Sequence, residues 1–100
     1  MIKFFDFEER PRGGWLLKID LDKFTEGSIS GSANVIACRL FGIDWPHWLR
    51  ICRGAGAQLM GRNTNWVLAV WKEPNKEFVR KLNVRANELS KLIDFKELRY

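Results

Sequence analysis

Alternating apolar and polar positions at the start of the chain predict a β-hairpin. Residues 2–9 are rich in phenylalanine, and the following segment places Trp15, Leu17 and Ile19 two residues apart. That spacing puts three apolar side chains on one face, which is typical of a half-buried strand. Residues 10–14, Arg-Pro-Arg-Gly-Gly, predict the turn between the strands, because proline presets φ and glycine permits a positive φ.

The middle of the chain has helical spacing instead. Apolar residues within 33–41 predict a helix that ends at Gly42. Asp44 is the expected N-cap of a second helix, which places Pro46 in the first turn, where proline is tolerated. We expect this helix to end at about Arg53, because a Gly-Ala-Gly sequence follows.

The last third of the chain predicts a second hairpin and a long amphipathic helix. Residues 57–60 and 66–71 are apolar runs around a short loop that contains glycine and asparagine. Asn75 is the expected N-cap of the helix. Its buried stripe is expected to contain Phe78, Leu82, Ala86, Leu89 and Ile93. Its solvated face is expected to contain Lys76, Arg80, Asn83, Asn87 and Lys91.

These elements predict a single α+β domain over residues 1–100, in the order β-β-α-α-β-β-α. Two hairpins would form an antiparallel sheet, and the C-terminal amphipathic helix would pack on it. A content of 46% hydrophobic and 13% aromatic residues is enough for a core and too high for a disordered chain. The expected core contains Phe4, Trp15, Leu17, Ile19, Ile36, Leu40, Ile51, Leu68, Val70, Phe78, Leu82, Leu89 and Ile93.

Positive charge is concentrated in the centre of the chain. Residues 28–72 hold five arginines and lysines against one acid, Asp44, and also hold four of the five tryptophans and the only histidine, His47. The net charge of the whole chain is +5. A basic, aromatic-rich centre favours an anionic partner, such as nucleic acid or an acidic protein surface.

Part of this centre has the spacing of a helix-turn-helix motif. Cys38 lies four residues before Gly42, where such a motif needs a small residue and a turn glycine. Residues 34–71 therefore resemble the winged helix-turn-helix class, which implies that Arg50 lies on the second helix and Arg62 at the tip of the wing. Strands precede the segment where that class has a supporting helix, and the second helix contains two tryptophans and a proline.

The same residues allow a second interpretation, in which arginines and exposed aromatic rings bind a single strand or structured RNA. Arginine pairs with phosphate, and indole rings stack on bases. Trp66 and Trp71 fall on opposite faces of one predicted strand, so one of them is expected to point outward. An exposed tryptophan could equally anchor a protein partner.

Candidate catalytic and metal-binding patterns are weak. Asp20 and Asp22 resemble the metal-binding start of cyclase and polymerase palm domains, but no second half of that pattern follows, and they fit the solvated face of a hairpin. Cys38 and Cys52 lack CxxC spacing, and His47 alone cannot complete a zinc site. We expect both cysteines to be small core residues, with a disulfide possible only between neighbouring helices. The chain is expected to be no enzyme and to need no cofactor or metal.

Three further segments resemble small proteins encoded by phages and prophages. They are residues 48–53 (Trp-Leu-Arg-Ile-Cys-Arg), Gly-Ala-x-x-x-Gly over 56–61, and residues 81–87 (Lys-Leu-Asn-Val-Arg-Ala-Asn). The resemblance implies a role against host defence, for instance as an anti-CRISPR protein.

The leading hypothesis is a small, basic, non-enzymatic binder of nucleic acid or of a nucleoprotein. Its expected contacts are Arg39, Trp45, His47, Arg50, Arg53 and Arg62. The alternative is a phage-encoded inhibitor of a host defence complex that works by protein–protein contact. No apolar run approaches the roughly 18 residues that span a membrane, and charges interrupt the apolar N-terminus, so no membrane partner and a cytoplasmic location are expected.

Overall fold

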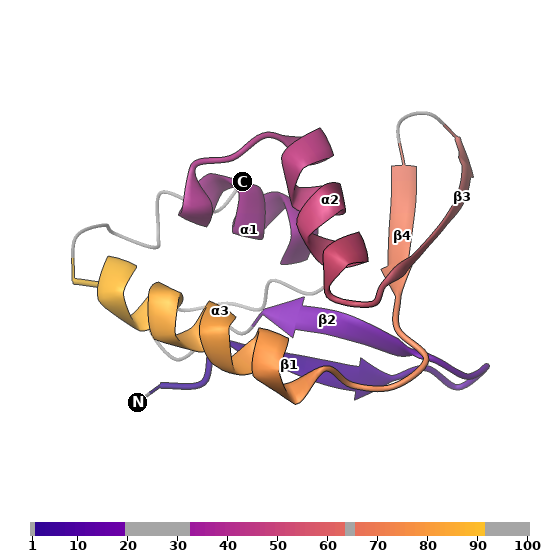
Figure 1. Ribbon diagram of the computed structural model, residues 1–100, viewed down its shortest axis with the longest axis horizontal. Helices are drawn as coiled ribbons and strands as arrows, with labels where there is room; N and C mark the ends of the chain where they lie inside the picture. The colour runs from indigo at the N-terminus through magenta and orange to yellow at the C-terminus, as the bar shows by residue number, and fades with distance from the viewer. Residues whose placement is uncertain (1, 20–32, 64–65, 92–100) are drawn as a thin grey trace.

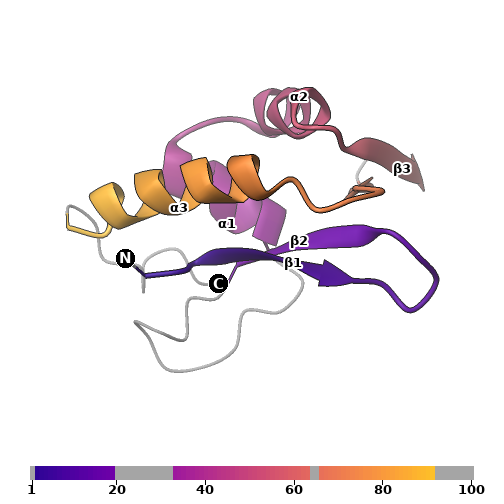
Figure 2. The ribbon, with the colours of Figure 1, turned by 60° about the horizontal axis from the view of Figure 1, so that its bottom comes forward.

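The computed structural model describes residues 2–19, 33–63 and 66–91, and it confirms the predicted α+β domain (Figure 1). The elements are β1 (Phe5–Glu9), β2 (Trp15–Ile19), α1 (Ala33–Phe41), α2 (Trp45–Gly54), β3 (Gln58–Asn63), β4 (Trp66–Val70) and α3 (Lys76–Leu89). Figure 2 shows β1 and β2 on one side of the molecule and α2 with β3 on the other.

The first hairpin has the face pattern that the sequence predicts. β1 pairs with β2 in antiparallel register, from Phe5 opposite Ile19 to Glu9 opposite Trp15. Leu17 and Ile19 are buried, whereas Lys18 between them is exposed. Alternate burial of this kind is what a two-residue period produces in a strand with one wet face.

The two hairpins form separate two-stranded sheets that a single bridge connects. The backbone N–H of Trp15 donates to Trp71 at 2.7 Å, and the N–H of Trp71 donates back to Trp15 at 2.9 Å. Pairing does not extend past Trp71, because the chain turns there into α3 and Pro74 has no N–H to donate. The predicted sheet is therefore two hairpins joined at one point.

The helix pair begins and ends where the sequence predicts. Gly42 has a φ of +65°, the left-handed conformation that ends many helices, and it follows the last residue of α1. The side chain of Asp44 accepts a hydrogen bond from the N–H of His47 at 2.9 Å, so it caps α2. These caps hold the two helices against each other through a short turn.

Aromatic side chains make up much of the core between the hairpins and helices. Its largest fully buried side chains are Trp48, Trp71, Phe4 and Phe5. The ring of Phe78 lies 6.0 Å from that of Trp71 and 6.3 Å from that of Trp48, so it links the strand end to α2. Ten of the expected core residues are buried or pack against this cluster, and these are Phe4, Trp15, Leu17, Ile19, Ile36, Leu40, Ile51, Phe78, Leu82 and Leu89. Val70 is also buried and Leu68 is half-buried, whereas Ile93 lies outside the described residues.

The predicted solvent-exposed face of α3 is confirmed at Lys76, Arg80 and Lys91 but wrong at Asn83. Asn83 was expected in solvent, but it is only 4% exposed. Its carboxamide accepts from the backbone N–H of Phe5 at 2.7 Å and donates to the carbonyl of Phe5 at 3.0 Å. Asn87, one turn later, makes the same pair of bonds with the backbone of Ile2. The polar stripe of α3 is therefore split, because Asn83 turns onto the edge of β1 and Asn87 turns onto the residues that precede it.

Candidate nucleic-acid interface

One face of the helix α2 packs into the core. Trp48 and Cys52 on that face are fully buried, and the indole N–H of Trp48 donates to the side chain of Asn34 on α1 at 2.9 Å. At the C-terminal end, the carbonyl of Ala55 accepts from the side chains of Trp71 and Asn75. The orientation of α2 is therefore fixed from both ends.

The opposite face of α2 is basic. His47, Arg50 and Arg53 are exposed and follow one another at intervals of three residues, which places them side by side on a helix. α2 contains no acidic residue, and its cap Asp44 is the only acid of residues 28–72. Within the part of the chain that the structure describes, neither Arg50 nor Arg53 forms an ion pair.

The arginines of α3 behave differently. Arg80 pairs with Glu77, and Arg85 pairs with Glu88 at 3.0 Å, each within one turn of the same helix. The guanidinium of Arg80 lowers the pKa of the Glu77 carboxyl, chiefly by hydrogen bonding. The positive charge on α3 is thus partly neutralised by its own carboxylates, whereas the charge on α2 is not.

The remaining predicted site residues are Arg39, Trp45 and Arg62. Arg39 is exposed in the last turn of α1, where a cation also stabilises the helix dipole. Trp45 is half-buried and packs against the core at the start of α2. Arg62 belongs to β3, and its side chain lies outside what the structure describes. The face that the structure brings together consists of His47, Arg50 and Arg53, which we call the α2 basic face.

The tryptophans do not form a stacking platform among the described side chains. Trp48 and Trp71 are at most 1% exposed, and Trp15 and Trp45 pack against the core. The side chain of Trp66, the other member of the predicted opposite-face pair, is not among those described. Most of the aromatic content of the basic centre therefore serves folding.

The arrangement keeps part of the winged helix-turn-helix likeness. α1, the turn at Gly42, α2 and the β3–β4 hairpin follow in the expected order. Trp45 and Trp48 pack against the core, so they do not lie on the α2 basic face, whereas Pro46 is exposed one turn before Arg50 on the same side of the helix. A hairpin, β1–β2, precedes the pair where the class has a helix.

Other chemistry has little support in the described residues. Burial raises the pKa of the Cys52 thiol to about 12 and also raises that of Cys38, which disfavours the nucleophilic thiolate in both. Both cysteines are free. Residues 2–19, 33–63 and 66–91 contain no cluster of three metal-ligating side chains. The helices among them are too short or too polar to cross a bilayer.

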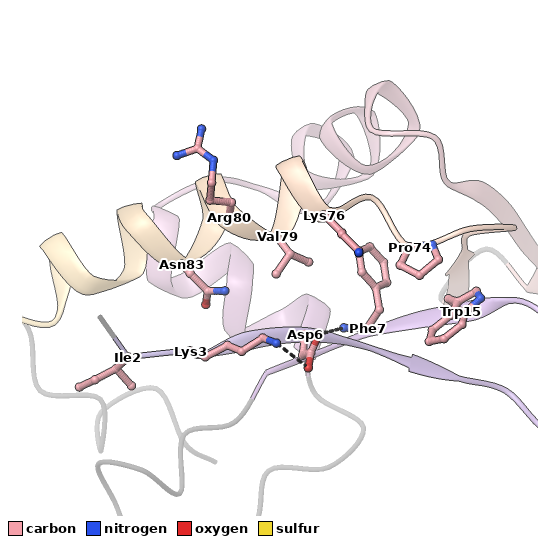
Figure 3. Close-up of a pocket in the computed structure, with 10 residues that line it drawn as sticks. All are labelled: Ile2, Lys3, Asp6, Phe7, Trp15, Pro74, Lys76, Val79, Arg80 and Asn83. Carbon is pink, nitrogen blue, oxygen red and sulfur yellow. Dashed lines mark hydrogen bonds and ion pairs between the residues drawn. The ribbon is translucent and has the colours of Figure 1, made fainter.

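A second surface feature was not anticipated from the sequence. An apolar groove of about 570 Å³ lies between β1 and the first turns of α3, with Phe7 and Trp15 on one side and Val79 on the other (Figure 3). Its signal in the sequence is faint, because these residues are far apart and each also fits an ordinary core position.

Comparisons with protein-family models, curated proteins and solved structures find no match for the chain.

Proposed function

We propose that the protein is a non-enzymatic binder that uses the α2 basic face to hold the phosphate backbone of a nucleic acid. The observation that carries this proposal is that Arg50 and Arg53 are exposed and without an ion pair among the described residues, whereas Arg80 and Arg85 on α3 are paired. Exposed guanidinium groups with no internal carboxylate are available for bidentate pairing with phosphate.

The burial of the tryptophans favours a duplex over a single strand as the target. Binding of single strands relies on bases stacked on aromatic rings, and the described rings are occupied by the core. A rigid helix with one basic face instead suits the regular phosphate spacing of a double helix. The flanking His47 adds a hydrogen-bond donor to the same face.

A salt titration tests the proposal directly. We expect binding to a labelled 20-base-pair DNA or RNA duplex at low salt, with affinity falling steeply as salt rises, because phosphate contacts release counterions. The Arg50→Ala and Arg53→Ala variants should each weaken binding and lower the salt slope by about one unit. Fluorescence anisotropy over a salt series measures both quantities.

The matched control is Arg85→Ala, which removes one exposed positive charge from α3. Because that arginine already pairs with Glu88, its loss should leave the slope nearly unchanged. Equal losses from all three variants would mean that net charge alone attracts the duplex. Absence of binding to either duplex at low salt would overturn the proposal. The alternative would then be the inhibitor hypothesis, in which the protein acts by protein–protein contact.

A further inference from the structure

The outer edge of β1 is only partly closed. Phe5 bonds through its N–H and carbonyl to Asn83, so its backbone points away from β2. In an antiparallel pair the direction alternates, and the backbone groups of Phe7 and Glu9 therefore point outward too. The N–H of Phe7 is satisfied by the side chain of Asp6. The carbonyl of Phe7 and both backbone groups of Glu9 have no partner among the described residues.

This free stretch of edge runs beside the apolar groove. Figure 3 shows Phe7 and Trp15 rising from the hairpin and Val79 descending from α3, while Arg80 points away. Asn83 also lines the groove. Its carboxamide occupies the position that a peptide group of a third strand would take beside Phe5. The edge thus has its first position filled by Asn83, its second open only at the carbonyl of Phe7, and its third open at both backbone groups of Glu9, beside the apolar groove.

A second copy of the chain fits this edge poorly. Closed two-fold pairing of identical edge strands is antiparallel. With Phe5 occupied, the two possible registers place either Glu9 opposite Glu9, or Glu8 opposite Glu8, where Lys18 offsets part of each charge. Like charges directly opposite one another destabilise a strand pair. Acidic residues on an edge strand are a recognised guard against self-association.

The same charges fit a different occupant. Glu9 is exposed and forms no ion pair within the described part of the chain. On an added antiparallel strand, the residue opposite Glu9 shares its face, and the residue two positions further on lies beside Phe7, at the groove. A lysine or arginine at the first position and a large apolar side chain at the second complement what the edge presents.

We propose that the β1 edge docks an extended segment of a partner protein, which adds a third strand with an apolar side chain in the groove and a cationic side chain opposite Glu9. Backbone hydrogen bonds to the carbonyl of Phe7 and to both backbone groups of Glu9 supply affinity, and the two side chains supply register, as in other cases of strand addition. This surface is separate from the α2 basic face, so the inference goes beyond the proposed function. Together they make the domain a connector between a nucleic acid and a protein segment.

The test uses a synthetic peptide, acetyl-Thr-Thr-Lys-Thr-Ile-Thr-Thr-amide, added to the full chain at millimolar concentration and followed by amide NMR. We expect hydrogen exchange at the Glu9 N–H to slow, because that donor becomes bonded, while exchange at Phe5 stays unchanged, because Asn83 already holds it. The same peptide with Glu in place of Lys should bind about fivefold more weakly.

Two substitutions at Glu9 separate the contribution of its backbone N–H to binding from that of its charge. Glu9→Pro removes the outward N–H while leaving the bonds of β1 to β2 intact, as edge strands allow, and should weaken binding by about tenfold. Glu9→Gln keeps the N–H, and should bind the Lys and Glu peptides equally. Unchanged exchange at Glu9, full binding by Glu9→Pro, or a dimer that protects Glu9 without peptide would each overturn the proposal.

Discussion

Asn83 completes the edge of β1 at Phe5 through a single side chain. A primary amide carries one acceptor and two donors, so it can satisfy a backbone N–H and a carbonyl at once, as a neighbouring strand would. Asn83 is 4% exposed and bonds to both groups of the fully buried Phe5. An unpaired backbone group in that position would carry the full cost of desolvation. The amide therefore lets a helix lie against a strand edge.

Replacing this amide by an apolar side chain of similar size should destabilise the folded protein. Asn83→Leu leaves the N–H and carbonyl of Phe5 buried without partners, and we expect a loss of about 2–4 kcal/mol in the free energy of unfolding. Asn87→Leu is the matched control, because its partner Ile2 is 40% exposed and water can replace the lost bonds. Urea denaturation of the two variants measures the difference, and equal losses would contradict the role assigned to Asn83.

Sequence periodicity could not have revealed this residue. A helix position is judged polar or apolar from its residue type, and asparagine falls on the polar side in any such pattern. What makes Asn83 a core residue is the strand edge beside it, and that edge begins 78 positions earlier in the chain. The prediction of a solvated stripe was wrong at Asn83 because hydrogen bonding, which periodicity does not see, decides the burial of an amide.

At the scale of elements, the close approach of the two hairpins depends on Gly14. It has a φ of +82°, and a Cβ placed on it would lie 2.6 Å from a methyl group of Val70 and 3.3 Å from the carbonyl of Trp71. The absence of a side chain lets the start of β2 reach the end of β4, where Trp15 and Trp71 exchange hydrogen bonds. The connection between the two sheets therefore passes through this glycine.

Adding one methyl group at Gly14 should weaken that connection. We expect Gly14→Ala to lower the free energy of unfolding by about 2–4 kcal/mol, from backbone strain and from the clash with Val70. Gly13→Ala is the control, because Gly13 also has a positive φ but an added Cβ would meet nothing within 4 Å. Its loss should be about 1 kcal/mol, from strain alone. Thermal unfolding compares the two, and similar losses would show that contact with β4 contributes nothing.

Local signals explain why the elements were predictable while their assembly was not. Asp44 and Asn75 cap helices through hydrogen bonds that lie within three residues, and Gly42 adopts its positive φ where the sequence places it. The single bridge between Trp15 and Trp71 instead joins residues that no local pattern connects. The sequence therefore indicates two hairpins and leaves open how they meet.

At the scale of the whole molecule, burial of a thiol predicts a pH dependence of stability. The pKa of Cys52 rises from 9.0 to about 12, chiefly because burial disfavours the thiolate. The unfolded chain loses this proton near pH 9, whereas the folded protein keeps it. The stability that Cys52 contributes is therefore fully present below pH 9 and is lost progressively as pH rises toward 12.

Urea denaturation at pH 8, 9 and 10 measures this effect. Between pH 9 and 10, the free energy of unfolding of the unmodified protein should fall by up to about 1 kcal/mol more than that of Cys52→Ala. Titration of lysine and tyrosine is common to both proteins and cancels in the difference. Parallel pH curves for the two proteins would mean that burial does not raise the pKa of the Cys52 thiol. Cys38→Ala, at a half-exposed position, should flatten the curve less.

The α2 basic face could be predicted in composition but not in extent. His47, Arg50 and Arg53 follow from helical spacing once α2 is assigned, since all three fall opposite Trp48 and Cys52. Whether Arg39 joins them depends on how α1 and α2 cross, which their sequences do not specify. The sequence also does not show which arginines are neutralised. The structure does, because Arg80 and Arg85 on α3 form ion pairs.

The hydrogen bonds between the first strand and the last helix also set an order of events during protein synthesis. Asn83 and Asn87 are separated from their partners by 78 and 85 residues. While the ribosome is still making the chain, β1 and β2 emerge early, and the backbone of Phe5 must wait for the first half of α3, which contains Asn83. The nascent hairpin therefore carries an open edge through most of translation. Glu9 acts during that interval as a guard against pairing with other nascent chains, whereas Asp6 and Glu8 pair with Lys3 and Lys18.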